Sequence, residues 1–185
     1  MYFDRNAIFS CLKKRKEIDL KVADDHLYHG AAMIQIAEHE HFTAINSLKV
    51  KGKVIRVAYR INDDIVAYLK YATKPTKAFK EYPFTFNKDS LDELTEISTT
   101  HSKIFIALVC VRDREICCIT YAQLQELIGR RSKEKGGPEG QYVVLVTVPS
   151  GKSLRVYVNT PGKRKTILGK MVTIPRNAFP NSLFS

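Results

Sequence analysis

An apolar run from Ile104 to Val111, with the sequence IFIALVCV, constrains the fold of this chain more than any other feature. A strand whose side chains are nearly all apolar has to be covered on both faces. That covering requires a central strand with other layers packed on either side of the sheet. The run therefore predicts a protein built from helices and strands around a buried sheet.

Two segments ahead of this run predict an antiparallel strand pair. Residues Lys53–Ile61 (KVIRVAYRI) and Ile65–Ala72 (IVAYLKYA) are rich in β-branched and aromatic residues, and Asn62, Asp63 and Asp64 between them are typical of a hairpin turn. Pro75 is expected to end the second strand, because proline cannot donate to a ladder. A further short strand is expected over Tyr82–Phe86.

A helix is predicted before the strand pair, over residues 26–40. Two aspartates stand where a helix begins and would favour its positive N-terminal dipole, Asp24 and Asp25. Apolar residues that recur at the helical period mark the face expected to turn to the core, Leu27, Ala31 and Ile34.

Two shorter helices are predicted after the strand pair. Ser90 and Glu93 have the spacing of a capping box, which predicts that a helix begins at Ser90. A second helix is expected from Thr120 or Tyr121 to Ile128, with Gly129 as its C-cap. The stretch that follows, RRSKEKGGPEG, has the composition of a loop.

The expected fold class is α/β, of the mixed α+β type, with a central mixed sheet flanked by helices. Residues Tyr142–Val148 and Leu154–Val158 predict a β-hairpin, which we expect to form a C-terminal extension. The expected division is a core over residues 1–129, with residues 130–185 supplying a basic loop, the hairpin and a tail packed on the same domain.

The positive charge is concentrated near the C-terminus. The chain has a net charge of +11, and residues 130–185 hold +9 of it, since they carry only Glu134 and Glu139 as acids. A concentrated basic surface attracts polyanions, of which phosphate backbones are the commonest. The residues expected to bind nucleic acid here are Arg130, Arg131, Lys133, Lys152, Arg155, Lys163, Arg164 and Lys165.

The order of elements resembles the restriction-endonuclease-like superfamily, also written PD-(D/E)xK. The similar stretch runs from Tyr28 to Ile128, and IVAYLKYATKP lies where the family carries the second strand of its active-site pair. Lys70 then matches the motif lysine. The resemblance implies a metal-dependent nuclease frame, in which two carboxylates hold Mg²⁺ and the lysine activates water.

The acids of that motif are missing. Tyr68 stands where the family has Glu or Gln, and the preceding strand offers Arg56 and Arg60 where an aspartate is expected. The resemblance therefore implies a degenerate site, in which both arginines would hold phosphate directly. If the domain is active, its catalytic residues would be Lys70, Asp63 and Asp64, and its Mg²⁺ ligands would be Glu38 and Asp64.

Three functions remain open from the sequence. The first is a non-catalytic protein, related to nucleases, that holds DNA or RNA by its backbone and needs no cofactor. The second is an active Mg²⁺-dependent endonuclease. The third is an interaction subunit of a larger protein or nucleoprotein complex, docking through the apolar C-terminus with Phe179, Leu183 and Phe184.

The remaining sequence features suggest an ordinary intracellular environment. The four cysteines lack metal-binding spacing, and Cys110, Cys117 and Cys118 lie in segments expected to be buried strands. No apolar run is long enough to cross a bilayer, and the N-terminus lacks the apolar core of a secretory signal. We therefore expect a cytoplasmic protein without a membrane partner.

Overall fold

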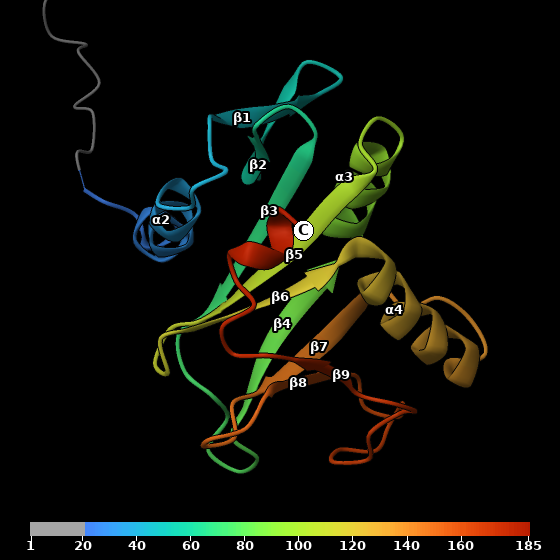
Figure 1. The fold of residues 1–185 in the computed structure, drawn as a ribbon. Helices are drawn as coiled ribbons and strands as arrows, with labels where there is room; N and C mark the ends of the chain where they lie inside the picture. Colours follow the sequence, from blue (N-terminus) through green and yellow to red (C-terminus); the bar gives the residue numbers. More distant parts are fainter. Residues whose placement is uncertain (1–20) are drawn as a thin grey trace, which may run out of the picture.

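The computed structural model describes residues 21–185, which form a mixed α+β fold with two sheets (Figure 1). Its α-helices are α2 (Asp24–Ala37), α3 (Lys88–Ser98) and α4 (Tyr121–Lys135). A short 3₁₀ turn, η1 (Asn181–Leu183), lies next to the C-terminus. The expected mixture of helices and strands is confirmed, and the two-sheet arrangement is new.

The first sheet is mixed and has five strands in the order β1-β2-β3-β5-β6. Its members are β1 (Ile45–Val50), β2 (Lys53–Ile61), β3 (Ile65–Ala72), β5 (Lys103–Cys110) and β6 (Glu115–Thr120). Strands β3 and β5 run parallel, with Ile65 opposite Lys103 and Ala72 opposite Cys110, and the other pairs are antiparallel. The expected strand pair is thus β2 and β3.

The second sheet is antiparallel, in the order β4-β7-β8-β9. It contains β4 (Glu81–Asn87), β7 (Gln141–Thr147), β8 (Leu154–Tyr157) and β9 (Val172–Ile174). The expected hairpin is β7 and β8, but it is not an appendage, because β7 pairs along its whole length with β4 from the first half of the chain. The boundary expected after residue 129 falls inside α4.

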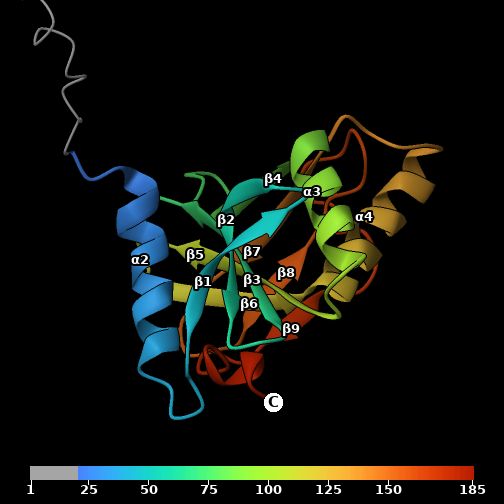
Figure 2. The same ribbon diagram turned by 90° about the horizontal axis from the view of Figure 1, so that it is seen from above.

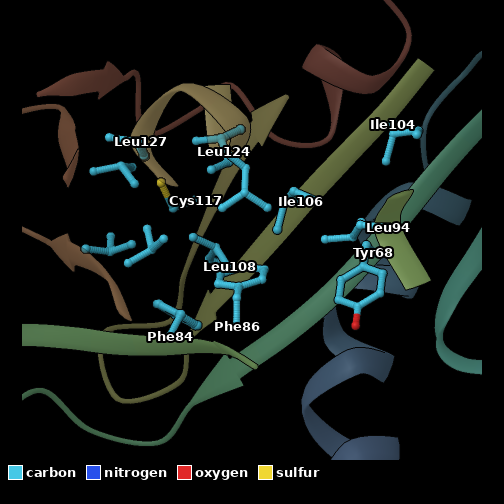
Figure 3. Close-up of a cluster of buried hydrophobic side chains, with 14 of the residues drawn as sticks. Tyr68, Phe84, Phe86, Leu94, Ile104, Ile106, Leu108, Cys117, Leu124 and Leu127 are labelled. Atoms are coloured by element: carbon cyan, nitrogen blue, oxygen red, sulfur yellow. The ribbon is translucent and has the colours of Figure 1, made fainter. Parts of the chain in front are cut away.

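The five-stranded sheet is covered on both faces, as the apolar run requires. Ala32 and Ile36 of α2 share one cluster with Ala67 and Leu69 of β3. The opposite face packs against α3, α4 and the second sheet in a larger cluster. Figure 2 shows α2 on one side of the sheet and α3 and α4 on the other, and Figure 3 shows side chains from these layers meeting in the larger cluster.

Helix α2 turns a different face to the core than the apolar period indicates. The structure buries His29, Ala32 and Ile36, whereas Leu27 is 55% exposed and Ile34 is 60% exposed. The small Ala32 lies in a cluster with two further alanines of the sheet, Ala67 and Ala107, which allows the helix to approach closely. Side-chain size at the contact, rather than hydrophobicity alone, selected the face.

The start of α3 and the end of α4 differ from the expected ones, whereas α4 begins at Tyr121 as expected. The N-cap of α3 is Asn87, whose side chain accepts a hydrogen bond from the Ser90 amide at 3.0 Å. Helix α4 begins with a capping box between Thr120 and Gln123, and it continues past Gly129 to Lys135, with Gly136 as its C-cap. Much of the expected loop is therefore helical, because a single glycine did not end the helix.

The C-terminal apolar residues pack on their own chain. Phe179 and Leu183 are buried in the cluster beneath α2, and the ring of Phe184 stacks on His39 at 4.1 Å. Cys110, Cys117 and Cys118 are buried as well, and burial raises the pKa of each thiol. Cys11 lies outside the described residues. Among the helices that the structure describes, none has the length and apolar character to cross a membrane.

The same substitution at a buried and at an exposed leucine should have effects of very different size. Leu108→Ala on β5 removes a fully buried side chain and should lower the free energy of unfolding by about 2–5 kcal/mol. Leu27→Ala on α2 is the matched control and should change it by less than about 0.5 kcal/mol. Urea unfolding measures both, and a large loss at Leu27 would contradict the observed orientation of α2.

Candidate nucleic-acid interface

A groove of about 870 Å³ opens on the face of the second sheet that points away from the core. Side chains alternate along a strand, so the neighbours of the core residues Tyr82 and Val144 point to this other side. Glu81 of β4, together with Val143 and Leu145 of β7, forms the floor. The floor is therefore largely apolar, with one carboxylate in it.

One wall of the groove is the loop formed by residues 159–167, directly after β8. It folds back on itself, since the Leu168 amide donates to the Val158 carbonyl at 2.9 Å and the Thr160 amide donates to the Thr166 carbonyl at 2.7 Å. These hydrogen bonds fix the shape of the loop. Its tip carries three consecutive cations, Lys163, Arg164 and Lys165.

The opposite wall is the loop formed by residues 76–80, directly before β4. The Thr76 amide donates to the Glu81 carbonyl at 2.8 Å, and the Lys80 amide donates to the Thr76 carbonyl at 3.0 Å. Phe79 is partly exposed in this loop, and Nζ of Lys165 lies 4.4 Å from its ring centre. This cation–π contact joins the two loops.

Arg131 holds the start of the 159–167 loop through a hydrogen bond. The side chain is only 19% exposed, and its guanidinium donates to the Asn159 carbonyl at 2.6 Å and to Glu139. The hydrogen bond from Arg131 lowers the pKa of Glu139. Arg131 therefore positions the 159–167 loop relative to α4, and the exposed cations that line the groove are Lys77, Lys163 and Arg164.

The carboxylate in the floor has a partner of its own. The Tyr157 hydroxyl donates to Oε1 of Glu81 at 2.5 Å, and both side chains are buried. Burial, and then this hydrogen bond, raises the pKa of Tyr157. A bound anion would thus meet the cations at the mouth before the carboxylate, which lies deeper and already accepts a hydrogen bond.

Some of the residues expected to bind nucleic acid converge at this groove. Arg131, Lys163 and Arg164 line it, and Lys165 lies beside them over Phe79. The sequence reasoning missed Lys77 and Phe79 on the other wall. A pattern in the sequence could have indicated both residues. The stretch TKPTKAFK, which follows a strand, has three lysines close to one aromatic residue.

The other expected binding residues lie elsewhere on the molecule. Arg130 is held by Glu126 and by the Lys170 carbonyl, and Lys133 is exposed on α4. Lys152 lies in the turn after β7, and Arg155 lies on β8. Strand β2 carries Arg56 and Arg60, which are exposed but belong to the first sheet, so the structure does not join them to the groove.

Lys70, the expected motif lysine, lies in a half-buried cluster at the junction of β3, β4 and α3. Its Nζ donates to Oγ of Ser90 at 3.4 Å and lies 5.0 Å from the ring centre of Phe86. The Tyr68 hydroxyl donates to Oε2 of Glu93 at 3.0 Å. Burial lowers the pKa of Lys70, and the charge of Glu93 opposes this effect.

The acids expected beside Lys70 are not there. Asp63 and Asp64 lie in the turn before β3, roughly 20 Å of extended strand away from Lys70, and Asp64 pairs with Lys103 at 2.9 Å. Glu38 is exposed at the end of α2. The carboxylate near Lys70 is that of Glu93, which the sequence had marked only as a capping residue. Residues 21–185 contain no cluster of three or more potential metal-binding side chains.

No protein family, curated protein or solved structure matches this chain in comparisons of sequence and fold. What the molecule binds is therefore inferred from the charge and shape of its own surfaces. The groove combines exposed cations with an apolar floor, whereas the Lys70 cluster combines one amine with one carboxylate. The first of these is the better polyanion site.

The Lys70 cluster makes a prediction that NMR can check. Glu93 stabilises the charged amine, so Glu93→Gln should lower the pKa of Lys70 further. The matched control is Glu96→Gln, because Glu96 pairs with Lys51 and not with Lys70. A pH titration that follows the Lys70 side-chain resonances measures the shift, and an unchanged or raised pKa in Glu93→Gln would contradict the cluster.

Proposed function

We propose that this chain is a non-catalytic nucleic-acid-binding protein that holds the phosphate backbone along the mouth of the groove. The observation that carries the proposal is the position of three exposed cations around one opening, Lys77, Lys163 and Arg164. They come from two loops far apart in the sequence. Such an arrangement attracts a chain of phosphates without needing a metal ion.

The rigidity of the walls supports this proposal. Flexible lysines on a disordered tail would lose conformational entropy on binding, whereas the 159–167 loop is already closed by backbone hydrogen bonds. Arg131 ties the loop to α4 at the Asn159 carbonyl. The cations at the tip are therefore held in one region before a ligand arrives.

The order of elements supports a relation to nucleases. A helix, α2, precedes the antiparallel pair β2–β3, and α3 leads to β5, which runs parallel to β3 and is followed by β6 and α4. The restriction-endonuclease-like resemblance implies this succession. At the positions of the motif acids the chain has Tyr68 and the arginines of β2.

The alternative of an active Mg²⁺-dependent nuclease has less support. Lys70 is available, but the nearby carboxylate, Glu93, already accepts a hydrogen bond from Tyr68. Asp63 and Asp64 lie at the other end of β3. Incubating the protein with plasmid DNA and RNA in the presence of Mg²⁺ tests this alternative, and cleavage that Lys70→Ala abolishes would favour it over the non-catalytic function.

A salt titration tests the proposed function. Affinity for a labelled oligonucleotide should fall steeply between about 50 and 200 mM salt, because each phosphate contact releases counterions. Reversing the groove cations by Lys77→Glu, Lys163→Glu and Arg164→Glu together should weaken binding for all sequences and make the log–log salt slope shallower by about 2 to 3. Fluorescence anisotropy measures both effects.

The matched control carries the same change of charge away from the groove. The variant with Lys49→Glu, Lys53→Glu and Lys88→Glu alters three exposed cations that do not line the groove. Its affinity and salt slope should stay close to those of the unaltered protein. Equal losses in the two variants would mean that net charge, rather than the groove, drives binding, and no binding at low salt would remove the proposal.

A further inference from the structure

The groove has features that phosphate binding alone does not require. A backbone site needs cations and hydrogen-bond donors, yet the floor here is formed partly by the apolar Val143 and Leu145. Its volume of about 870 Å³ is within the usual range for small-molecule sites, roughly 300–1,000 Å³. An uncharged, flat group would fill this space better than a phosphate.

Phe79 provides a surface on which such a group can stack. Its ring is partly exposed at the groove, and the exposed Lys165 places its ammonium 4.4 Å from the ring centre. Lysine side chains rearrange readily because they have many rotatable bonds. A nucleobase can therefore replace the ammonium on the ring, while Lys165 moves to a neighbouring phosphate.

Asn159 also lines the groove, and it carries a side-chain oxygen without a hydrogen-bond partner. The side-chain Oδ1 is buried and has no hydrogen-bond partner, although the backbone carbonyl of the same residue accepts from Arg131. A buried acceptor without a donor is unfavourable, so a ligand N–H that reaches it gains more than the same group would in water. Every nucleobase carries at least one N–H on the edge used for pairing.

We propose that the groove binds an unpaired base of a single-stranded nucleic acid, stacked on Phe79 and donating an edge N–H to Asn159. The phosphates on either side of this base lie against Lys163 and Arg164. A duplex cannot bind in this way, because its bases are stacked on each other and their pairing edges are occupied. This inference rests on the proposed function and narrows its ligand to single strands.

The test compares probes that share their phosphates and differ in their bases. The probes are a 12-nucleotide single strand as DNA and as RNA, the matching DNA duplex, and a fully abasic single strand of equal length. The variants are Phe79→Leu, which keeps apolar bulk but removes the π face, and Phe79→Tyr, which keeps it. Fluorescence anisotropy at fixed low salt measures the affinity of each protein variant for each probe.

Phe79→Leu should weaken binding of the single strand about 5- to 150-fold, the range of about 1–3 kcal/mol that base stacking on an aromatic contributes. Phe79→Tyr should bind nearly as well as the unaltered protein. The abasic strand keeps the phosphates but has no base that could stack on residue 79. Phe79→Leu should therefore bind this strand as tightly as the unaltered protein does.

The possible failures can be told apart. Equal losses with Phe79→Leu on the base-bearing and abasic strands would show that the ring only supports the fold of the loop, and would overturn the inference. An unchanged affinity of Phe79→Leu for the single strand, or duplex binding as tight as single-strand binding, would overturn it as well and leave the phosphate-binding function standing. If no probe binds at low salt, the proposed function itself fails.

Discussion

The parallel ladder between β3 and β5 is the constraint on which the rest of the structure depends. Parallel neighbours cannot be joined by a tight turn, so the chain has to cross over one face of the sheet between them. Here the crossover carries β4 and α3. Strand β4 does not pair with the first sheet, and it forms a second sheet on that face with β7, β8 and β9.

The groove follows from this second sheet. Strand β4 has one face in the core and the other on the outside. Strand β7 pairs with β4, and β8 pairs with β7, so both faces continue across these strands. Because β4 and β8 run in the same direction, the loop that leads into β4 and the loop that leaves β8 start at opposite ends of the sheet, and both contribute residues to the groove on its outer face. The hydrogen bond between Tyr157 and Glu81 joins β8 to β4 across β7, which lies between them.

The strands were more predictable than the surface. Residues Lys53–Ile61 and Ile65–Ala72 were given correctly by local pattern, because turn residues and proline mark their ends. The short strands β1 and β9 were missed, since β1 (INSLKV) is half polar and β9 has only three residues. Pairing between β4 and β7 is a long-range contact that no local pattern encodes.

The candidate site was predictable only in part for the same reason. Lys163, Arg164 and Lys165 could be named from the sequence because they are consecutive. Their counterparts, Lys77 and Phe79, lie some eighty residues earlier and become relevant only when the sheet brings the two loops together. Conversely, Arg130 and Arg131 contribute to the charge count, yet both are held by acids and carbonyls of the chain.

The contact between Lys165 and Phe79 has a consequence for selectivity. The ammonium of Lys165 already lies against the ring of Phe79, so a ligand that stacks on this ring gains its own stacking energy and loses the cation–π contact that it displaces. When a free aromatic compound binds, the contact between Lys165 and Phe79 is lost and the ammonium gains no new partner. A base attached to phosphates gives the displaced ammonium a new counterion, so the groove discriminates between bases within a strand and bases alone.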